Sequence, residues 1–208
     1  MDRADLVTNC ISGTNESLGS LDWFASNVAG YVPLEEPFFT DPNQEVGGMP
    51  VRSADFFEWN LCLDELDYAL AMRTELISRG FPDSIGMVID TSRNGWGGPD
   101  RPASASASND LNTYVNQSRI DRREHRCSWC NQESTENAGL GERPTASPET
   151  GIDAYAWIKP PGESDGISVD GAADPDDPNK TYDIMCGPAE QSVYNSSYGT
   201  GAIPDSPH

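Results

Sequence analysis

The heptapeptide SIGMVID, Ser84–Asp90, decides how this chain is expected to fold. It is an apolar run too short for a helix, and turn-forming residues bound it. Such a run is typical of a strand buried on both faces of a parallel sheet. The predicted strand ends in a carboxylate, Asp90, which has two interpretations. It caps the following turn through an Asx hydrogen bond, or it supports a ligand site.

The residues before this strand predict a helix. Apolar side chains recur at helical spacing, and Gly80 stands at the C′ position ahead of Pro82. The recurring residues are Leu63, Leu66, Ala69, Leu70, Met72, Leu76 and Ile77. A helix, a short loop, a buried strand and the polar loop Thr91–Asn109 follow one another. This order indicates an α/β fold, either a barrel or a doubly wound sheet.

A second strand is predicted in DAYAWIKPPGESDG, residues 153–166. Tyr155, Trp157 and Ile158 fit a short buried strand, which the following Pro-Pro-Gly stops abruptly. Lys159, Glu163 and Asp165 then lie close together at the end of this strand. A lysine beside two carboxylates at a strand's carboxyl end suits acid–base chemistry, although such a cluster is more often a solvated loop with a surface ion pair.

Composition limits the partners. The 208 residues suffice for one domain, and 13 Lys and Arg against 34 Asp and Glu give a formal charge of −21. Nucleic acid and anionic membranes are therefore repelled, and a neutral or cationic ligand is favoured. No apolar run approaches a membrane span. The N-terminus does not resemble a signal peptide, so either the protein is cytosolic or its true beginning is missing.

Several segments together resemble a known family. They are SNVAGYVPLEEPF (26–38), GGMPVRSADFFEWN (47–60), GFPDSIGMVIDTSRNGWGGPDRP (80–102), IDRREHR with SWCNQ (120–132), AGLGERPTASP (138–148) and DAYAWIKPPGESDG (153–166). Their residues and order are similar to the C-terminal half of the family 6 glycoside hydrolases, the inverting cellulases. The first two segments look like the bacterial cellobiohydrolase branch.

The resemblance implies a fold and an activity. The fold would be the C-terminal part of a distorted, incompletely closed, TIM-like α/β barrel with long loops. Residues 26–208 would form this part, with 1–25 a poorly defined N-terminal segment. The activity would be hydrolysis of β-1,4-glucosidic bonds in cellulose with inversion. The PLEEP loop resembles loops that enclose a substrate tunnel, which favours release of cellobiose from chain ends. No cofactor is expected.

The resemblance also assigns roles to residues near the second strand. Asp165 matches the family's proposed catalytic base, which must activate water across the sugar ring from a carboxylic acid. Lys159 and Glu163 match residues that bind the glucosyl units nearest the cleavage point. Lysine donates hydrogen bonds to hydroxyl groups, and glutamate accepts them. Asn131 is assigned to substrate binding as well.

Arg93 matches an arginine that pairs with active-site aspartates in this family. Its position after the strand makes Asp90 a possible hydrogen-bond partner that supports the ligand. Neither residue is assigned to catalysis.

The tryptophans divide by their surroundings. Trp157 lies within the predicted strand and is expected in the core. Trp59, Trp96 and Trp129 stand among Gly, Asn, Arg and Asp, which is poor core context. Sugar C–H faces stack on exposed aromatic rings, so these three are predicted sugar platforms. The resemblance places Trp129 in the cleft.

The cysteines have two interpretations. Cys127 and Cys130 beside His125 suit zinc, but no second pair of ligands is evident, and a small metalloprotein is disfavoured. The family resemblance instead implies a disulfide between Cys130 and Cys186. Such a bond typically stabilises a fold by about 2–4 kcal/mol. No metal site is predicted.

One part of the family pattern is missing. The family's general acid is an aspartate in a motif of the form YDLPDRDC, which this sequence lacks. We therefore expect the chain to be the C-terminal part of a longer, secreted cellulase, which can carry carbohydrate-binding modules. The alternative is a non-catalytic glucan-binding remnant.

The arginines at 122, 123 and 126 are expected to form internal salt bridges in so acidic a chain.

The missing acid leads to a first prediction. The purified 208-residue chain is expected to release no cellobiose from swollen cellulose, because inversion needs both carboxyl groups. Chromatography of soluble sugars after prolonged incubation would measure this. Accumulation of cellobiose by the purified chain would contradict the prediction.

Overall fold

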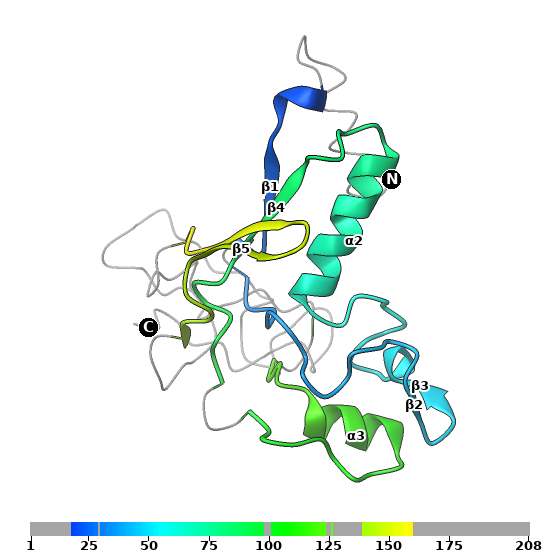
Figure 1. Ribbon diagram of the computed structural model, residues 1–208. Helices are drawn as coiled ribbons and strands as arrows, with labels where there is room; N and C mark the ends of the chain where they lie inside the picture. Colours follow the sequence, from blue (N-terminus) through cyan, green and yellow to red (C-terminus); the bar gives the residue numbers. More distant parts are fainter. Residues whose placement is uncertain (1–17, 29, 98–100, 124–125, 127–138, 160–208) are drawn as a thin grey trace, which may run out of the picture.

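The computed structural model describes residues 18–28, 30–97, 101–123, 126 and 139–159 (Figure 1). Its centre is a four-stranded sheet in the order β1 (Trp23–Ser26), β4 (Gly86–Asp90), β6 (Ile152–Ala156) and β5 (Thr145–Glu149). The first three strands are parallel, and β5 runs antiparallel at the edge. The α/β prediction is therefore confirmed. The described residues contain no closed barrel.

Strand β4 occupies the interior of this sheet. All five of its residues are buried. Ala25 of β1 pairs with Val88, and Tyr155 of β6 pairs with Ile89, so β4 has a parallel neighbour on each side. An apolar strand without polar alternation is what two covered faces require. The strand predicted from SIGMVID is confirmed.

Helix α2 (Glu65–Ser78) covers one face of the sheet and lies beside β4 in Figure 1. It begins at Asp64, whose Oδ1 accepts a hydrogen bond from the Asp67 N–H at 2.9 Å. It ends at Arg79, followed by Gly80 in the left-handed region at φ 95°. The predicted helix and its stop are confirmed. The core that it shares with the sheet contains Ala69, Leu76, Phe81, Ile85, Met87, Ile89 and Ile152.

A second core packs around a hairpin and a short helix. The hairpin joins β2 (Glu45–Val46) to β3 (Met49–Pro50) through Gly47 and Gly48, which both have positive φ. A Cβ on Gly47 would lie 2.3 Å from the Asn109 carbonyl oxygen, so that close approach requires glycine. The remaining elements are η1 (Leu18–Ser20), η2 (Val51–Ser53) and α3 (Leu111–Ser118). The second core contains Phe39, Val46, Val51, Ala54, Phe56, Phe57, Leu63, Tyr114 and Val115.

The second predicted strand is shorter than expected. Strand β6 ends at Ala156, and the side chains of Trp157 and Ile158 are exposed, so their expected burial is wrong. The backbone N–H groups of Ile158 and Lys159 donate to the Asp90 carboxylate instead of continuing the ladder. A strand cannot be extended once its donors are taken by a side chain.

Among the described helices, none combines the length and apolarity needed to cross a bilayer.

The two cores lead to a stability prediction. Leu76→Ala is expected to lower the free energy of unfolding by about 2–5 kcal/mol, since it empties a fully buried site. Leu61→Ala removes the same atoms from a side chain that is 59% exposed, so its effect should stay within about 0.5 kcal/mol. Urea unfolding followed by circular dichroism would measure both. Equal losses in the two variants would contradict the described packing.

Candidate active site

The carboxyl ends of the three parallel strands meet at Asp90. Its buried Oδ1 accepts from the Ser92 N–H at 2.9 Å, and its Oδ2 accepts from the Lys159 N–H at 2.9 Å. The Asn27 side chain, just after β1, donates to the Asp90 carbonyl oxygen at 3.1 Å. The Asx interpretation of Asp90 is confirmed. The same carboxylate also fixes the backbone of Lys159 at this edge of the sheet.

Arg93 and Trp96 pack around one tyrosine below this edge. The Arg93 guanidinium carbon lies 4.7 Å from the centre of the Tyr31 ring. The Trp96 ring meets Tyr31 edge-on, and its indole N–H donates to the Tyr31 carbonyl oxygen at 3.1 Å. Trp96 is only 7% exposed, so the predicted exposed sugar platform is wrong for this residue. The distant Tyr31 carbonyl oxygen satisfies the indole N–H, so the ring can lie in the interior although its neighbours in sequence are polar.

A cavity of about 390 Å³ opens beside this edge. Three loops and the segment after α3 form its walls. The lining residues are Leu34, Glu35, Pro37, Asn94, Gly95, Arg101, Ile120, Leu140, Gly141 and Glu142. The volume falls in the range that holds small organic ligands. Apolar surface mixed with carboxylates, an amide and a guanidinium suits a neutral polyhydroxylated ligand.

The loop after β4 and the loop before β5 are packed tightly to form this cavity. The Gly141 N–H donates to the Thr91 carbonyl oxygen at 2.9 Å, and the Gly95 N–H to Gly139 at 2.8 Å. A Cβ on Gly95 would lie 2.0 Å from the Leu140 carbonyl oxygen, so only glycine allows this approach. The two walls are therefore rigidly joined.

Arg101 closes the cavity on the side of the β4 loop. Its Nε donates to the Trp96 carbonyl oxygen and its Nη2 to that of Asn94, both at 2.7 Å. Burial lowers the pKa of the Arg101 guanidinium. A guanidinium held by two carbonyl groups is oriented before any ligand arrives, which favours directional hydrogen bonding.

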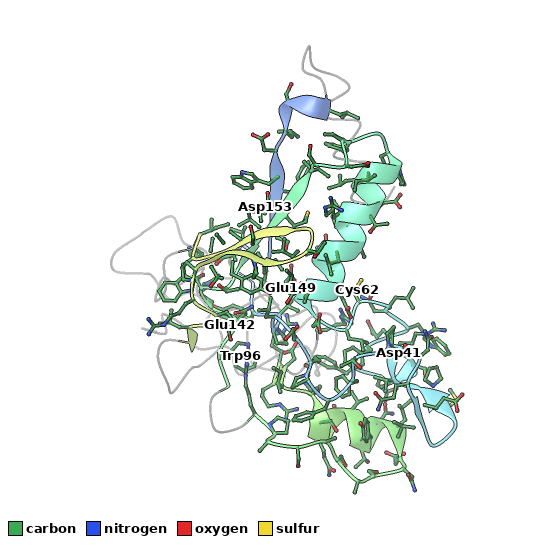
Figure 2. All side chains as sticks on the ribbon, in the orientation of Figure 1. Asp41, Cys62, Trp96, Glu142, Glu149 and Asp153 are labelled. Atoms are coloured by element: carbon green, nitrogen blue, oxygen red, sulfur yellow. The ribbon has the colours of Figure 1, made fainter. Side chains whose placement is uncertain are left out.

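Trp157 is a candidate binding residue that the sequence pattern did not reveal. Its indole N–H donates at 3.0 Å to the carbonyl oxygen of Glu142, a cavity residue labelled in Figure 2. Trp157 as a whole residue is 38% exposed. The apolar run around it suggested burial, and only the early end of β6 places it at the surface.

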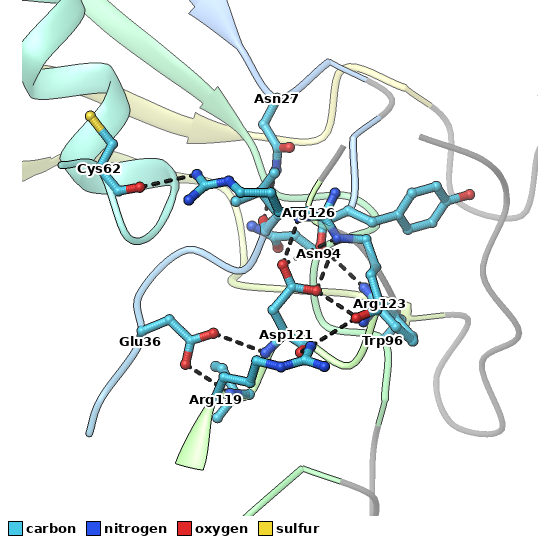
Figure 3. Close-up of polar contacts among 12 residues, drawn as sticks. Asn27, Glu36, Cys62, Asn94, Trp96, Arg119, Asp121, Arg123 and Arg126 are labelled. Atoms are coloured by element: carbon cyan, nitrogen blue, oxygen red, sulfur yellow. Dashed lines mark hydrogen bonds and ion pairs between the residues drawn. The ribbon is translucent and has the colours of Figure 1, made fainter. Parts of the chain in front are cut away.

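The acidic loop 33–37, which forms part of the cavity wall, carries a buried carboxylate, Glu36, which is 2% exposed. Its two oxygens accept hydrogen bonds from the Ile120 N–H at 2.7 Å and the Asp121 N–H at 2.9 Å (Figure 3). Its own N–H donates to Asp64 Oδ2 at 2.9 Å. Burial raises the pKa of Glu36 to about 7, although the two N–H donors oppose the shift. Burial likewise raises the pKa of Asp64 to about 6.

Behind this wall lies an ion pair between Arg123 and Asp121. Both side chains are buried, and their shortest contact is 2.6 Å. The internal salt bridge expected for the arginine run is thus confirmed at Arg123. Arg122 donates to the Asn116 carbonyl oxygen at 2.8 Å, and Arg126 to that of Cys62 at 3.0 Å.

Other predicted site residues lie elsewhere. Trp59 is 57% exposed, with the Arg52 guanidinium carbon 5.0 Å from its ring centre, and it does not line the cavity. Within the described residues, no three His, Cys, Asp or Glu form a group that could hold a metal ion. Six predicted residues lie outside the described part of the chain: Trp129, Cys130, Asn131, Glu163, Asp165 and Cys186.

Comparison with known proteins identifies the family. The family model for glycosyl hydrolases family 6 matches residues 2–199. The chain belongs to this family. Exoglucanase A of Cellulomonas fimi is 46% identical over 208 residues, which are 98% of this chain and 23% of that protein.

Two solved structures resemble this family 6 chain. The catalytic domain of Cellulomonas fimi Cel6B matches with a TM-score of 0.84 and 43% identity, over 99% of this chain and 46% of that chain. A mutant of the cellobiohydrolase Cel6A from Humicola insolens, in complex with methyl-tetrathio-α-D-cellopentoside, matches with a TM-score of 0.53 and 25% identity. That match covers 88% of this chain and 37% of the other. The chain thus spans less than half the length of these relatives.

The raised pKa of Glu36 leads to a pH prediction. Between pH 4.5 and about 7 the unfolded chain has lost this proton while the folded chain keeps it. The free energy of unfolding should therefore fall as pH rises through this window, by about 3 kcal/mol from this group. Glu36→Gln should make the fall about half as large, because the comparable contribution of Asp64, whose pKa burial raises to about 6, remains.

Urea unfolding at a series of pH values would measure this, with Glu45→Gln as the control because Glu45 is an exposed glutamate. An equally steep fall in Glu36→Gln and in the wild-type chain would contradict the assignment.

Proposed function

We propose that this chain supplies the sugar-binding side and the catalytic base of an enzyme that hydrolyses β-1,4-glucosidic bonds in cellulose with inversion. The observation that carries the proposal is family membership over almost the whole chain, together with the cavity at the carboxyl ends of the parallel strands. Active sites of α/β proteins lie at this edge of the sheet.

The proposed roles follow from what each group can do. Asp165 is the base that activates water, while Lys159 and Glu163 bind hydroxyl groups of the adjacent glucosyl units. The hydrogen bond from the Lys159 N–H to Asp90 supports this assignment, because it holds the start of that segment at the strand ends. Arg93 and Asp90 are supporting residues that orient the loop after β4.

Aromatic and amide groups complete the proposed binding surface. Trp129 and Trp59 are proposed to stack on sugar rings, and Asn131 to hydrogen-bond them. Trp157 joins them as a candidate, since its exposed ring adjoins the cavity residue Glu142. Stacking needs an open ring face, which the buried Trp96 does not offer. Trp96 is therefore proposed to support the site from below.

The acid partner is proposed to come from a part of the catalytic domain beyond this chain. In inverting enzymes the two carboxyl groups stand about 6.5–9.5 Å apart, with water between the base and the sugar. Residues 26–208 would then be the C-terminal part of an incompletely closed α/β barrel, and the disulfide between Cys130 and Cys186 would brace it. Relatives named exoglucanase and cellobiohydrolase support release of cellobiose from chain ends.

Cellulose and its oligosaccharides are the proposed ligands. A family 6 structural neighbour was solved with a thio-cellopentoside, which supports binding of cello-oligosaccharides here. Insoluble cellulose cannot enter a cell, so we propose that the protein is secreted. Carbohydrate-binding modules are proposed for the full-length enzyme.

Replacement of the proposed base tests this function. In the full-length enzyme, Asp165→Asn should lower the rate on swollen cellulose by about 10²–10⁴-fold, because water is no longer activated. Asp153→Asn is the matched control, since Asp153 is exposed on β6 and should leave the rate unchanged. Release of reducing sugars would be measured.

If Asp165→Asn kept most of the wild-type rate, the assignment of the base would be wrong. If the full-length wild-type protein bound cello-oligosaccharides without hydrolysing them, it would be a glucan-binding protein rather than an enzyme.

A further inference from the structure

The loop from Pro33 to Pro37 contributes two different surfaces. Leu34, Glu35 and Pro37 line the cavity of about 390 Å³. Glu36, between them, instead buries its carboxylate in the protein. A buried carboxylate needs hydrogen-bond donors to offset its lost hydration. Its donors therefore show what the loop is attached to.

Both donors belong to the segment after α3, which forms another wall of the cavity. Ile120 lines the same cavity, and its N–H donates to Glu36 Oε2 at 2.7 Å. The next N–H along the chain, that of Asp121, donates to Oε1 at 2.9 Å. Two backbone donors on two oxygens of one carboxylate fix both distance and orientation. The contact joins residues 84 and 85 positions apart in sequence.

The loop itself is anchored from behind to helix α2. The carbonyl oxygens of Pro33 and Leu34 accept from the N–H groups of Glu65 and Leu66, each at 3.1 Å. Asp64, the N-cap of α2, also accepts from the Glu36 N–H at 2.9 Å. The bonds from Glu65 and Leu66 satisfy donors of the first helical turn, which have no partners within the helix. The loop thus has a rigid support.

We propose that Glu36 is a positioning residue that sets the width of the cavity by holding Ile120 and Asp121 against the loop 33–37. Through Glu36, the segment at Ile120 and Asp121, which is in neither a helix nor a strand, is bonded to a loop that is itself anchored to α2. That the cavity holds a glucosyl unit rests on the proposed function. The attachment between the two walls does not.

The attachment can be observed through the titration of Glu36, which has charged groups on several sides. Asp64 and Asp121 face it with like charge, and Arg101 and Arg119 with opposite charge. Burial raises the pKa of Glu36 to about 7, so its protonation changes within a range where the folded chain can be studied. The amide protons bonded to a carboxylate report its titration directly.

Nuclear magnetic resonance of the isotope-labelled 208-residue chain tests the attachment. The amide resonances of Ile120 and Asp121 should shift with pH around a midpoint near 7. Glu36→Gln should abolish this titration and speed exchange of at least one of the two amides by about tenfold or more. Glu45→Gln, which removes an exposed glutamate, should change neither.

The wild-type titration needs no variant, so the test holds even if Glu36→Gln unfolds. If neither amide shifted in the wild-type chain, the proposal would be overturned.

Binding of cellotetraose, followed by calorimetry, tests the consequence for the cavity. Glu36→Gln should weaken binding by about tenfold relative to Glu45→Gln, while the folded fraction stays equal by circular dichroism. Equal affinities with altered amide resonances would overturn the positioning role. If wild type itself bound no cellotetraose, the sugar assignment would fail, and the amide resonances would still decide whether Glu36 holds the wall.

Discussion

The arrangement of this molecule depends on the carboxylate of Asp90 at the end of β4. One oxygen accepts from the turn that follows β4, and the other accepts from the chain that follows β6. A single buried side chain therefore ends two neighbouring strands and directs both of their loops to the same edge. The loop after β4 supplies Asn94, Gly95 and Arg101 to the cavity. The chain after β6 continues into Lys159, Glu163 and Asp165.

A chain with a formal charge of −21 nevertheless buries three arginines near this site. Arg93, Arg119 and Arg123 are buried, and their partners are a tyrosine ring, a phenylalanine ring and the Asp121 carboxylate. Weakly hydrated guanidinium groups tolerate such positions better than ammonium groups. Five carboxylates are buried in the described part of the chain as well: Glu36, Asp64, Glu65, Asp90 and Asp121.

Local patterns predicted the elements whose environment is uniform along their length. Helix α2 and strand β4 repeat one environment over several residues, so their periodicity was sufficient. Strands β1 and β5 are edge strands, and β5 exposes four of its five residues, so neither carries a clear pattern. The predictions for Trp96 and Trp157 were wrong for a related reason. Trp96 has polar neighbours in sequence, but its ring packs against Tyr31 in the interior. Trp157 has apolar neighbours in sequence, but its side chain is exposed.

By itself the sequence determined the α/β class, the helix that covers the sheet, the central strand with its terminal carboxylate, and the family. These follow from residue order, since period, capping residues and long motifs are properties of neighbours along the chain. Only the tertiary structure decided that Glu36 bonds to Ile120 and Asp121, that Trp96 is buried, and that β6 ends early. Each depends on hydrogen-bond partners at least 65 positions away, and distance along the chain leaves no local signal of such contacts.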